Sequence, residues 1–111
     1  MKYLIVVIFL SACTSNASLP EYKVLDQLTE IDGTKFGEIL IESYSHETPV
    51  EEIENTLEQI AQKIHVNKIA LYCSEEAERA DYSESYMKAH PEAAKCILGI
   101  YQYRVFYPSR R

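Results

Sequence analysis

Glycine is scarce in this chain of 111 residues, and no glycine-rich loop occurs in it. Only Gly33, Gly37 and Gly99 are present, so the chain offers no closely spaced glycines to cradle a phosphate group and no oxyanion-binding loop. The sequence also has no internal repeat and no low-complexity tract. These absences argue against a nucleotide-binding enzyme and favour one compact body after Pro20.

A long apolar run is also missing. Residues 4–10 are apolar throughout, but crossing a membrane takes about twenty such residues. Lys2 gives this run a positively charged head, and the small residues Ser11 and Ala12 follow it. A charged head, a short apolar core and a small-residue cleavage site are the parts of a secretory signal peptide. The alternative is a buried strand that precedes a cysteine, which the position at the extreme amino terminus disfavours.

The end of this run, Leu10-Ser11-Ala12-Cys13, resembles the lipobox of bacterial lipoprotein precursors. In that family the cysteine thiol takes a diacylglyceryl group, the signal is cut just before it, and the new amino terminus is acylated, commonly with palmitate. The resemblance implies a signal peptide over residues 1–12 and lipidation of Cys13 in the cell membrane, facing the periplasm. By the same analogy, Thr14 favours the outer over the inner membrane of a Gram-negative host.

Basic residues are few, with 11 Lys and Arg against 17 Asp and Glu. Removal of the signal takes away Lys2 and leaves 10 basic and 17 acidic residues, a net charge of −7. Such a surface repels phosphate backbones, so no nucleic acid partner is expected. Arg104, Arg110 and Arg111 form a small basic end, which the sequence leaves open as a site or as a solubilising terminus.

The chain divides into an anchor, a tether and a single domain. Residues 13–20 are small and polar and end at a proline, which is typical of a short tether. At roughly 3.3 Å per extended residue, this tether reaches only about 20 to 25 Å, so the domain works close to its membrane. Residues 21–107 form the domain, and residues 108–111 a basic tail.

The domain is predicted to be α+β, with a small mixed sheet of three or four strands and one main helix. Asp32 and Gly33 give a turn signal between two strand patterns, which indicates a hairpin. The short apolar run of residues 69–73 predicts a strand covered on both faces. The order strand, helix, strand then predicts a right-handed parallel crossover. The predicted strands cover residues 22–31, 36–44, 69–73 and 97–107.

The main amphipathic helix is predicted over about residues 48–65. Its apolar side chains recur at helical spacing on one face: Val50, Ile53, Leu57, Ile60, Ala61 and Ile64. Thr48 and Glu51 match a capping box, and Pro49 stands between them as the favoured first helical residue. We therefore expect the helix to begin at this motif.

Cys73 and Cys96 remain as the other cysteines once Cys13 carries lipid. Beyond the inner membrane the compartment is oxidising, which favours a disulfide. If the strands at the two cysteines are antiparallel neighbours, a bond there closes an excursion of 22 residues and contributes about 3 kcal/mol. The alternative is two separate buried thiols. The spacing is not that of a redox-active C-x-x-C pair.

The excursion has the most unusual composition in the chain, being acidic and rich in tyrosine. It is predicted to form a short helical segment over about residues 75–90, begun by the cap Ser74 and stopped by Pro91. It is a candidate binding surface, because loops held by a rigid scaffold often carry function; the alternative is a solvated cover over the sheet. Its motifs YCS, ADYS and AHPEA loosely resemble small bacterial proteins of unknown function. The candidate residues are Glu75, Glu76, Glu78, Asp81, Tyr82, Tyr86 and His90.

Metal and catalytic signals are weak. His46, His65 and His90 are the only histidines, and none stands at metal-ligand spacing from another or from a cysteine. We therefore expect no metal and no cofactor. Cys73 with His90 could form a nucleophile and its base, but no third residue is placed to orient them. No catalytic residue is assigned, and the chain is not expected to be an enzyme.

Three hypotheses for function follow. The first is a membrane-anchored, non-catalytic envelope lipoprotein that binds another envelope protein or ligand through the acidic excursion or an exposed strand edge. An immunity or exclusion factor is one version of it. The second is a structural accessory or spacer of an envelope assembly. The third is a small hydrolase or thiol enzyme. The sequence favours the first.

Overall fold

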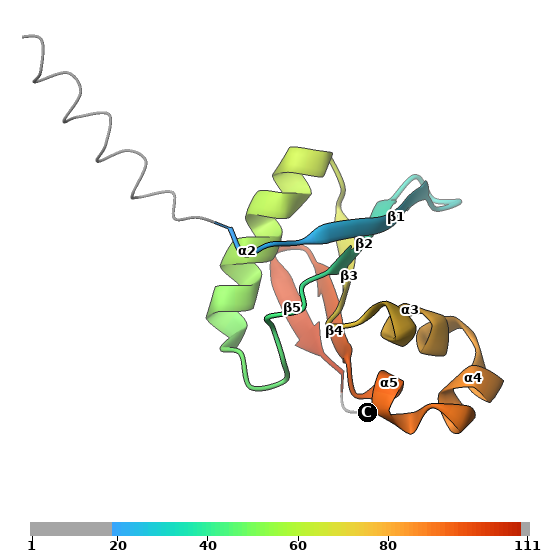
Figure 1. Cartoon of the computed structure of the whole chain (residues 1–111). Helices are drawn as coiled ribbons and strands as arrows, with labels where there is room; N and C mark the ends of the chain where they lie inside the picture. The colour runs from blue at the N-terminus through green and yellow to red at the C-terminus, as the bar shows by residue number, and fades with distance from the viewer. Residues whose placement is uncertain (1–18, 110–111) are drawn as a thin grey trace, which may run out of the picture.

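The computed structural model describes residues 19–109, so the predicted signal peptide, Cys13 and most of the tether lie outside the described residues. Within this part the chain forms one mixed sheet with helices on both faces (Figure 1). The strands are β1 (Lys23–Thr29), β2 (Lys35–Leu40), β3 (Lys68–Tyr72), β4 (Ile97–Gln102) and β5 (Val105–Pro108). The helices are α2 (Val50–Ile64), α3 (Glu75–Tyr82), α4 (Glu84–Ala89) and α5 (Pro91–Ala94). The α+β class is confirmed, but the sheet has five strands rather than three or four.

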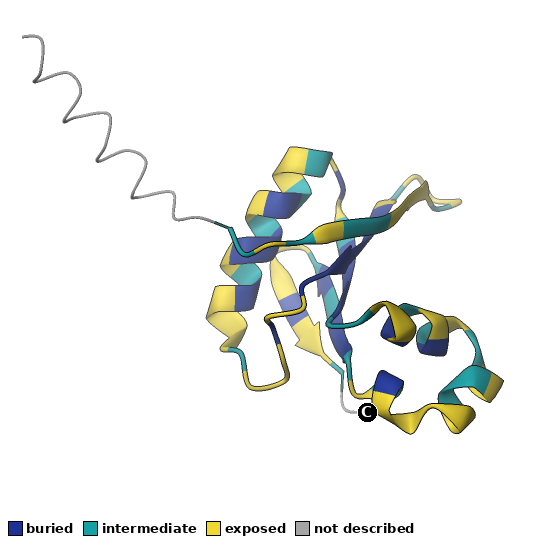
Figure 2. Ribbon diagram, in the orientation of Figure 1, coloured by how far each residue is buried: buried dark blue, intermediate teal, exposed yellow. Residues whose placement is uncertain are grey.

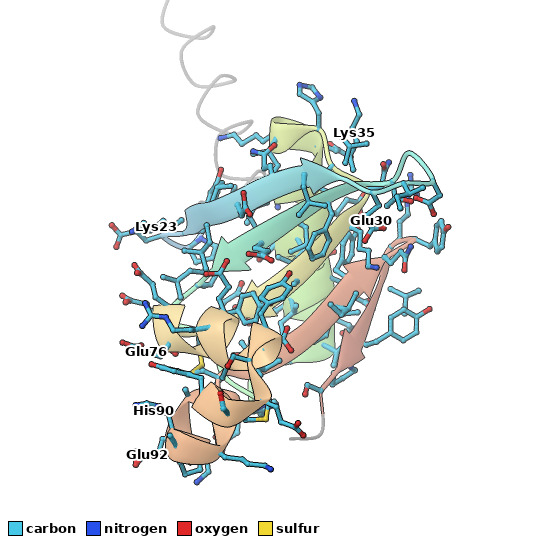
Figure 3. All side chains as sticks on the ribbon, turned by 90° about the vertical axis from the view of Figure 1, so that its right-hand side faces the viewer. Lys23, Glu30, Lys35, Glu76, His90 and Glu92 are labelled. Atoms are coloured by element: carbon cyan, nitrogen blue, oxygen red, sulfur yellow. A yellow bond between two sulfur atoms is a disulfide. The ribbon has the colours of Figure 1, made fainter. Side chains whose placement is uncertain are left out.

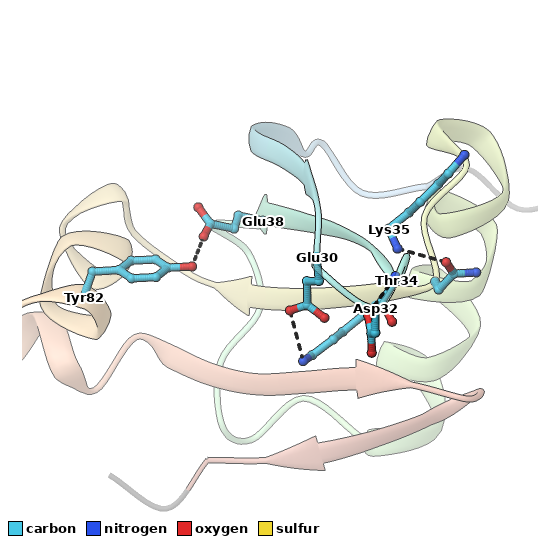
Figure 4. A network of polar contacts seen from close by, with 8 residues as sticks. Glu30, Asp32, Thr34, Lys35, Glu38 and Tyr82 are labelled. Atoms are coloured by element: carbon cyan, nitrogen blue, oxygen red, sulfur yellow. Dashed lines mark hydrogen bonds and ion pairs between the residues drawn. The ribbon is translucent and has the colours of Figure 1, made fainter.

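The strands lie in the sheet in their chain order. β2 and β3 are parallel, and the other neighbouring pairs are antiparallel. The predicted hairpin between β1 and β2 and the predicted parallel crossover through α2 are both present. The hairpin loop is closed at Asp32, whose Oδ1 accepts the Thr34 N–H at 2.9 Å, while Gly33 takes φ 90° (Figure 4). Hydrogen bonding from the backbone and side chain of Thr34 lowers the pKa of Asp32.

The last strand differs from the prediction. It was expected to run unbroken over residues 97–107, whereas the chain reverses at Tyr103 and Arg104, and Gln102 pairs with Val105. Both turn residues have positive φ, 56° and 66°. This left-handed geometry suits the twist of a tight hairpin but is usually supplied by Asn or Gly, so the sequence carried no turn signal.

The second strand ends at Leu40, before the predicted residue 44. The chain turns beyond it, because the N–H of Tyr44 donates to the carbonyl of Ile41 at 3.2 Å. The Tyr44 side chain is buried, and its hydroxyl shares a hydrogen bond of 2.7 Å with that of Thr56 on α2. A tertiary contact with the helix, which local sequence does not reveal, fixes this turn.

α2 covers one face of the sheet, as its apolar periodicity predicted (Figure 2). Ile53, Leu57 and Ile60 are almost fully buried there, whereas Val50, predicted on the same face, is exposed at the first residue of the helix. The three buried side chains pack against a core from the strands and from the residue after β2, which includes Ile39, Ile41, Ile69, Leu71, Leu98, Tyr101 and Phe106. This face therefore holds the main hydrophobic core.

The predicted capping box of this helix is wrong. Pro49 occupies the cap position, and no side chain makes a cap hydrogen bond there. The Thr48 hydroxyl instead accepts the N–H of Ser45 at 2.9 Å and closes the preceding turn. Glu51 and Glu52 still lie in the first turn, where the helix dipole favours negative charge.

On the other face α3 packs against β3 and β4, and α4 and α5 pack against α3 as the chain returns to β4 (Figure 1). Ser74 caps α3 as predicted, since its Oγ accepts the Ala77 N–H at 3.1 Å. α4 ends before Pro91, but this proline then begins α5. The helices contribute small side chains to a second cluster, made of Phe36, Ala70, Tyr72, Ala77, Ala80, Ala93 and Ile97. Small residues let the helices approach the sheet closely.

Candidate functional site

A disulfide closes the base of the acidic excursion. The Sγ atoms of Cys73 and Cys96 lie 2.06 Å apart, and the Cys73 N–H donates to the Cys96 carbonyl at 2.9 Å. The predicted pairing is thus confirmed, and for the predicted reason: β3 and β4 are antiparallel neighbours and the cysteines face each other across their ends. The three short helices are therefore attached to the sheet as one covalent loop, called here the α3–α5 segment.

Part of the predicted surface does point outward. Glu75, Glu76 and His90 are exposed, and Figure 3 shows Glu76 and His90 on the outer side of the segment. Glu75 makes an ion pair of 3.0 Å with Lys23 of β1. Tyr86 is half-buried, and its ring stacks on that of His90 with the centroids 4.0 Å apart. Tyr86 also packs against the second hydrophobic cluster, so the stack attaches the His90 ring to the segment.

The outer side also contains a hollow of about 440 Å³. Glu76, His90 and Glu92 are the ionisable residues that line it, and all three are exposed. Pro91 and Ala93 are among its apolar lining residues. A hollow lined by both acidic and apolar side chains can receive a lysine or arginine. The apolar stem of such a side chain would contact the apolar residues, and its charged head would contact the acidic ones.

Three predicted surface residues are directed toward the sheet instead. Asp81 accepts a hydrogen bond of 2.8 Å from the Tyr72 hydroxyl on β3. The Tyr82 hydroxyl donates to Oε2 of Glu38 on β2, although the rest of its ring is exposed (Figure 4). Glu78 is half-buried and acts electrostatically on the same Glu38 carboxyl. The candidate set is thus divided between an outer surface and an inner polar cluster.

Glu38 is the polar residue at the centre of this inner cluster, and the sequence reasoning missed it. It is only 2% exposed, and its Oε1 makes no hydrogen bond within the described residues. Burial raises the pKa of Glu38 from 4.5 to about 7, helped by the neighbouring Glu78 and by the charge of Asp26, while the Tyr82 hydrogen bond acts in the opposite direction. A carboxyl group with this pKa exchanges its proton near neutral pH.

The two tyrosines in the cluster act as hydrogen-bond donors. Burial raises the pKa of the Tyr72 hydroxyl, and its bond to Asp81 adds to the effect. The pKa of Tyr82 is also raised, by burial and by its bond to Glu38. Both phenols therefore keep their protons at any physiological pH, and they link the segment to two different strands.

A sequence signal for Glu38 did exist. It interrupts the apolar run FGEILI, in which alternation places it on the same side of the strand as Phe36 and Leu40. Both sides of β2 are buried, so a carboxyl group here had to be taken out of water. A lone acid in a strand that is buried from Phe36 to Leu40 is costly unless other side chains partner it.

Residues 19–109 contain no group of three or more His, Cys, Asp or Glu placed to hold a metal ion. Within the same range no helix has both the length and the apolar character needed to cross a membrane. The histidines lie apart: Nε2 of His46 contacts the Lys95 carbonyl at 2.9 Å, His65 caps the end of α2, and His90 stacks on Tyr86.

No family model, no curated protein and no solved structure matches this chain. Its function is therefore inferred from its own residues.

Proposed function

We propose that this chain is a membrane-anchored, non-catalytic lipoprotein of the bacterial cell envelope that binds a basic segment of another envelope protein. Binding occurs at the outer side of the α3–α5 segment. The resemblance of Leu10-Ser11-Ala12-Cys13 to a lipobox supports the anchor, and a short tether would keep the domain near the membrane. The acidic composition of the chain supports a basic partner, because charge complementarity steers association and excludes other acidic surfaces.

The main support is the arrangement of Glu76, His90 and Glu92 around one hollow of about 440 Å³. The disulfide Cys73–Cys96 connects the helices that carry these residues to the sheet. A surface held in this way loses little conformational entropy when a partner binds, which favours affinity.

The fate of Cys73 supports a binding role over thiol chemistry. Its sulfur is bonded to Cys96 and is therefore not free to act as a thiolate with His90 as base. The alternative role, a structural spacer, requires no defined outer surface on the α3–α5 segment. The binding experiment below separates it from the proposed function.

The test of binding is charge reversal at the rim of the hollow. The double variant Glu76→Lys, Glu92→Lys is compared with Glu47→Lys, Glu51→Lys, which changes the net charge equally at exposed positions outside the segment. Partners are cross-linked in detergent-solubilised membranes and quantified by mass spectrometry. We expect a stoichiometric partner whose recovery falls at least tenfold only in the first variant. Equal recovery in both variants, or equal loss, contradicts the assignment of the surface.

The anchor is tested separately at Cys13. We expect the intact mass of the native protein to correspond to a chain beginning at Cys13 with added acyl groups, recovered in the membrane fraction. Cys13→Ser should release the protein from that fraction or leave it unprocessed. A soluble native chain that still begins at Met1 would refute the anchor and the envelope location together.

A further inference from the structure

Acidic groups gather between α3 and the strands that it contacts. The carboxyl group of Glu38 accepts a hydrogen bond from Tyr82 through Oε2, whereas Oε1 has no partner among residues 19–109 (Figure 4). A buried carboxylate oxygen without a partner is unfavourable. If Oε1 carries a proton it becomes a donor, and the carboxylate of Glu78 is the neighbouring acceptor that already acts on Glu38.

The groups that face Glu38 are acids and phenols. Asp26 on β1 stands opposite it in the strand register, and Tyr72 on the other neighbouring strand interacts with it electrostatically. α3 contributes Glu78 and Tyr82 to this group. Asp81 of the same helix is connected to it by the hydrogen bond from Tyr72.

The basic side chains nearby are engaged elsewhere. Lys23 pairs with Glu75, and the guanidinium of Arg79 lies over the Tyr86 ring, 5.4 Å from its centroid. No ion pair with Glu38 occurs in the described part of the chain. A proton is therefore the positive charge that this cluster can take up.

We propose that Glu38, buried on β2 and bonded to Tyr82 of α3, is a proton-binding site that holds α3 against the sheet. Uptake of one proton from solvent by the Glu38 carboxyl closes the α3–α5 segment, and return of that proton to solvent loosens it. The proton site is independent of the proposed function. Only its expected consequence, that partner binding at the outer surface changes with pH, rests on the proposed function.

The direction of the effect follows from linkage. In the closed form the pKa of Glu38 is raised to about 7, and in an opened, hydrated form it returns toward its ordinary value of 4.5. The closed form therefore binds the proton more tightly than the opened form. It is most favoured at a pH below 4.5, and it loses this advantage as the pH rises through about 7. Between pH 5.5 and 8.5 we expect opening of the segment to rise about tenfold or more.

Loosening of α3 does not require unfolding of the domain. The disulfide keeps both ends of the segment at the sheet, and the core beneath α2 lies on the opposite face. The segment contributes mainly alanines to its own cluster, so it has less apolar area to lose than α2 does.

The experiment is amide hydrogen exchange on the full chain at pH 5.5 to 8.5, with rates corrected for intrinsic exchange. We expect protection of α3 to fall about tenfold across this range while α2 stays constant. Glu38→Gln, which keeps the shape of the side chain but does not titrate, should abolish the pH dependence. Glu42→Gln, an exposed position beyond the same strand, should behave as wild type. A constant α3 in wild type, or an unchanged fall in Glu38→Gln, overturns the proposal.

A second measurement covers the case in which Glu38→Gln does not fold. The Glu38 carboxyl carbon is titrated by NMR in the wild-type chain, and we expect a midpoint near 7, whereas a midpoint near 4.5 overturns the proton site.

Partner recovery at pH 5.5 and 8.5 then tests the link between the proton site and binding. pH-dependent exchange together with pH-independent recovery supports the proton site and removes its role in binding. Absence of any partner at either pH contradicts the proposed function alone.

Discussion

Oε2 of Glu54 on α2 accepts a hydrogen bond of 2.9 Å from the backbone N–H of Phe106 on β5. β5 is the last strand of the sheet, so its outer edge has no neighbouring strand within the described residues. Unpaired N–H groups on such an edge can pair with a strand of another molecule. Glu54 occupies one of them and thereby protects the edge from association.

Removal of this carboxylate should expose the edge. We expect Glu54→Ala to lower the free energy of unfolding by about 1 to 3 kcal/mol, because a partly buried N–H loses its acceptor. We also expect concentration-dependent self-association through β5. Urea denaturation and sedimentation measure the two effects. Glu54→Gln is the matched control, since its amide oxygen still accepts; equal behaviour of both variants would show that the hydrogen bond does not protect the edge.

Gly99 on β4 is expected to be the least replaceable glycine. Its φ is 151°, and a Cβ at this position would lie 2.3 Å from the Tyr107 carbonyl oxygen on β5. At Gly37 a Cβ would meet the movable end of the Ile64 side chain at 3.3 Å. Thermal unfolding should show that Gly99→Ala destabilises the domain by several kcal/mol, about the cost of overpacking added to backbone strain. Gly37→Ala should cost clearly less, and the reverse order would contradict this reading of the β4–β5 hairpin.

Substitution of the two residues in the β4–β5 turn is expected to stabilise the domain. Tyr103 and Arg104 are exposed and both hold a left-handed conformation that asparagine and glycine adopt more easily. Replacement of the pair by Asn-Gly is expected to raise the free energy of unfolding by about 1 kcal/mol, by relief of backbone strain. Chemical denaturation provides the measurement. A decrease in stability would indicate that the two side chains make contacts that outweigh the strain.

The disulfide should stabilise the domain through the α3–α5 segment. Cys73→Ala, Cys96→Ala removes the closure of a 22-residue excursion and is expected to cost about 3 kcal/mol. Hydrogen exchange should show the loss of protection first in α3, α4 and α5 and only later in α2. Calorimetry with and without reductant gives the total effect in the unmodified chain. An unchanged melting temperature on reduction would contradict a stabilising role.

Some parts of this fold could be predicted because their cause is local. The buried face of α2 follows from side-chain spacing over fifteen residues, and the hairpin loop at Asp32 and Gly33 follows from turn chemistry. The pairing of Cys73 with Cys96 needed one further assumption, that their strands are antiparallel neighbours. The structure satisfies it.

Other parts could not be predicted because packing, or a competing local hydrogen bond, overrides the local signal. The turn at Tyr103 and Arg104 has no turn-forming residues, and it exists because Tyr101 and Phe106 must both face the core from adjacent strands. Thr48 gave a capping signal, but its hydroxyl accepts the N–H of Ser45 in the structure. Packing overrides local preference in the first case, and one local hydrogen bond displaces another in the second.

The candidate site shows the same division. Composition alone identified the acidic excursion, but it could not distinguish Glu76, which faces solvent, from Glu78 and Asp81, which face the sheet. Helical spacing gives the relative directions of side chains, whereas the direction that is buried depends on where the helix docks.

By itself the sequence determined the α+β class, the buried stripe of α2, the cap at Ser74 and the excess of negative charge, because each depends on residue type or on short-range spacing. Only the tertiary structure decided the fifth strand, the protected edge at Phe106 and the burial of Glu38 beneath Tyr82. The reason is physical: the free energy of a carboxyl group depends on whether water surrounds it, and chain segments more than forty residues apart decide that together.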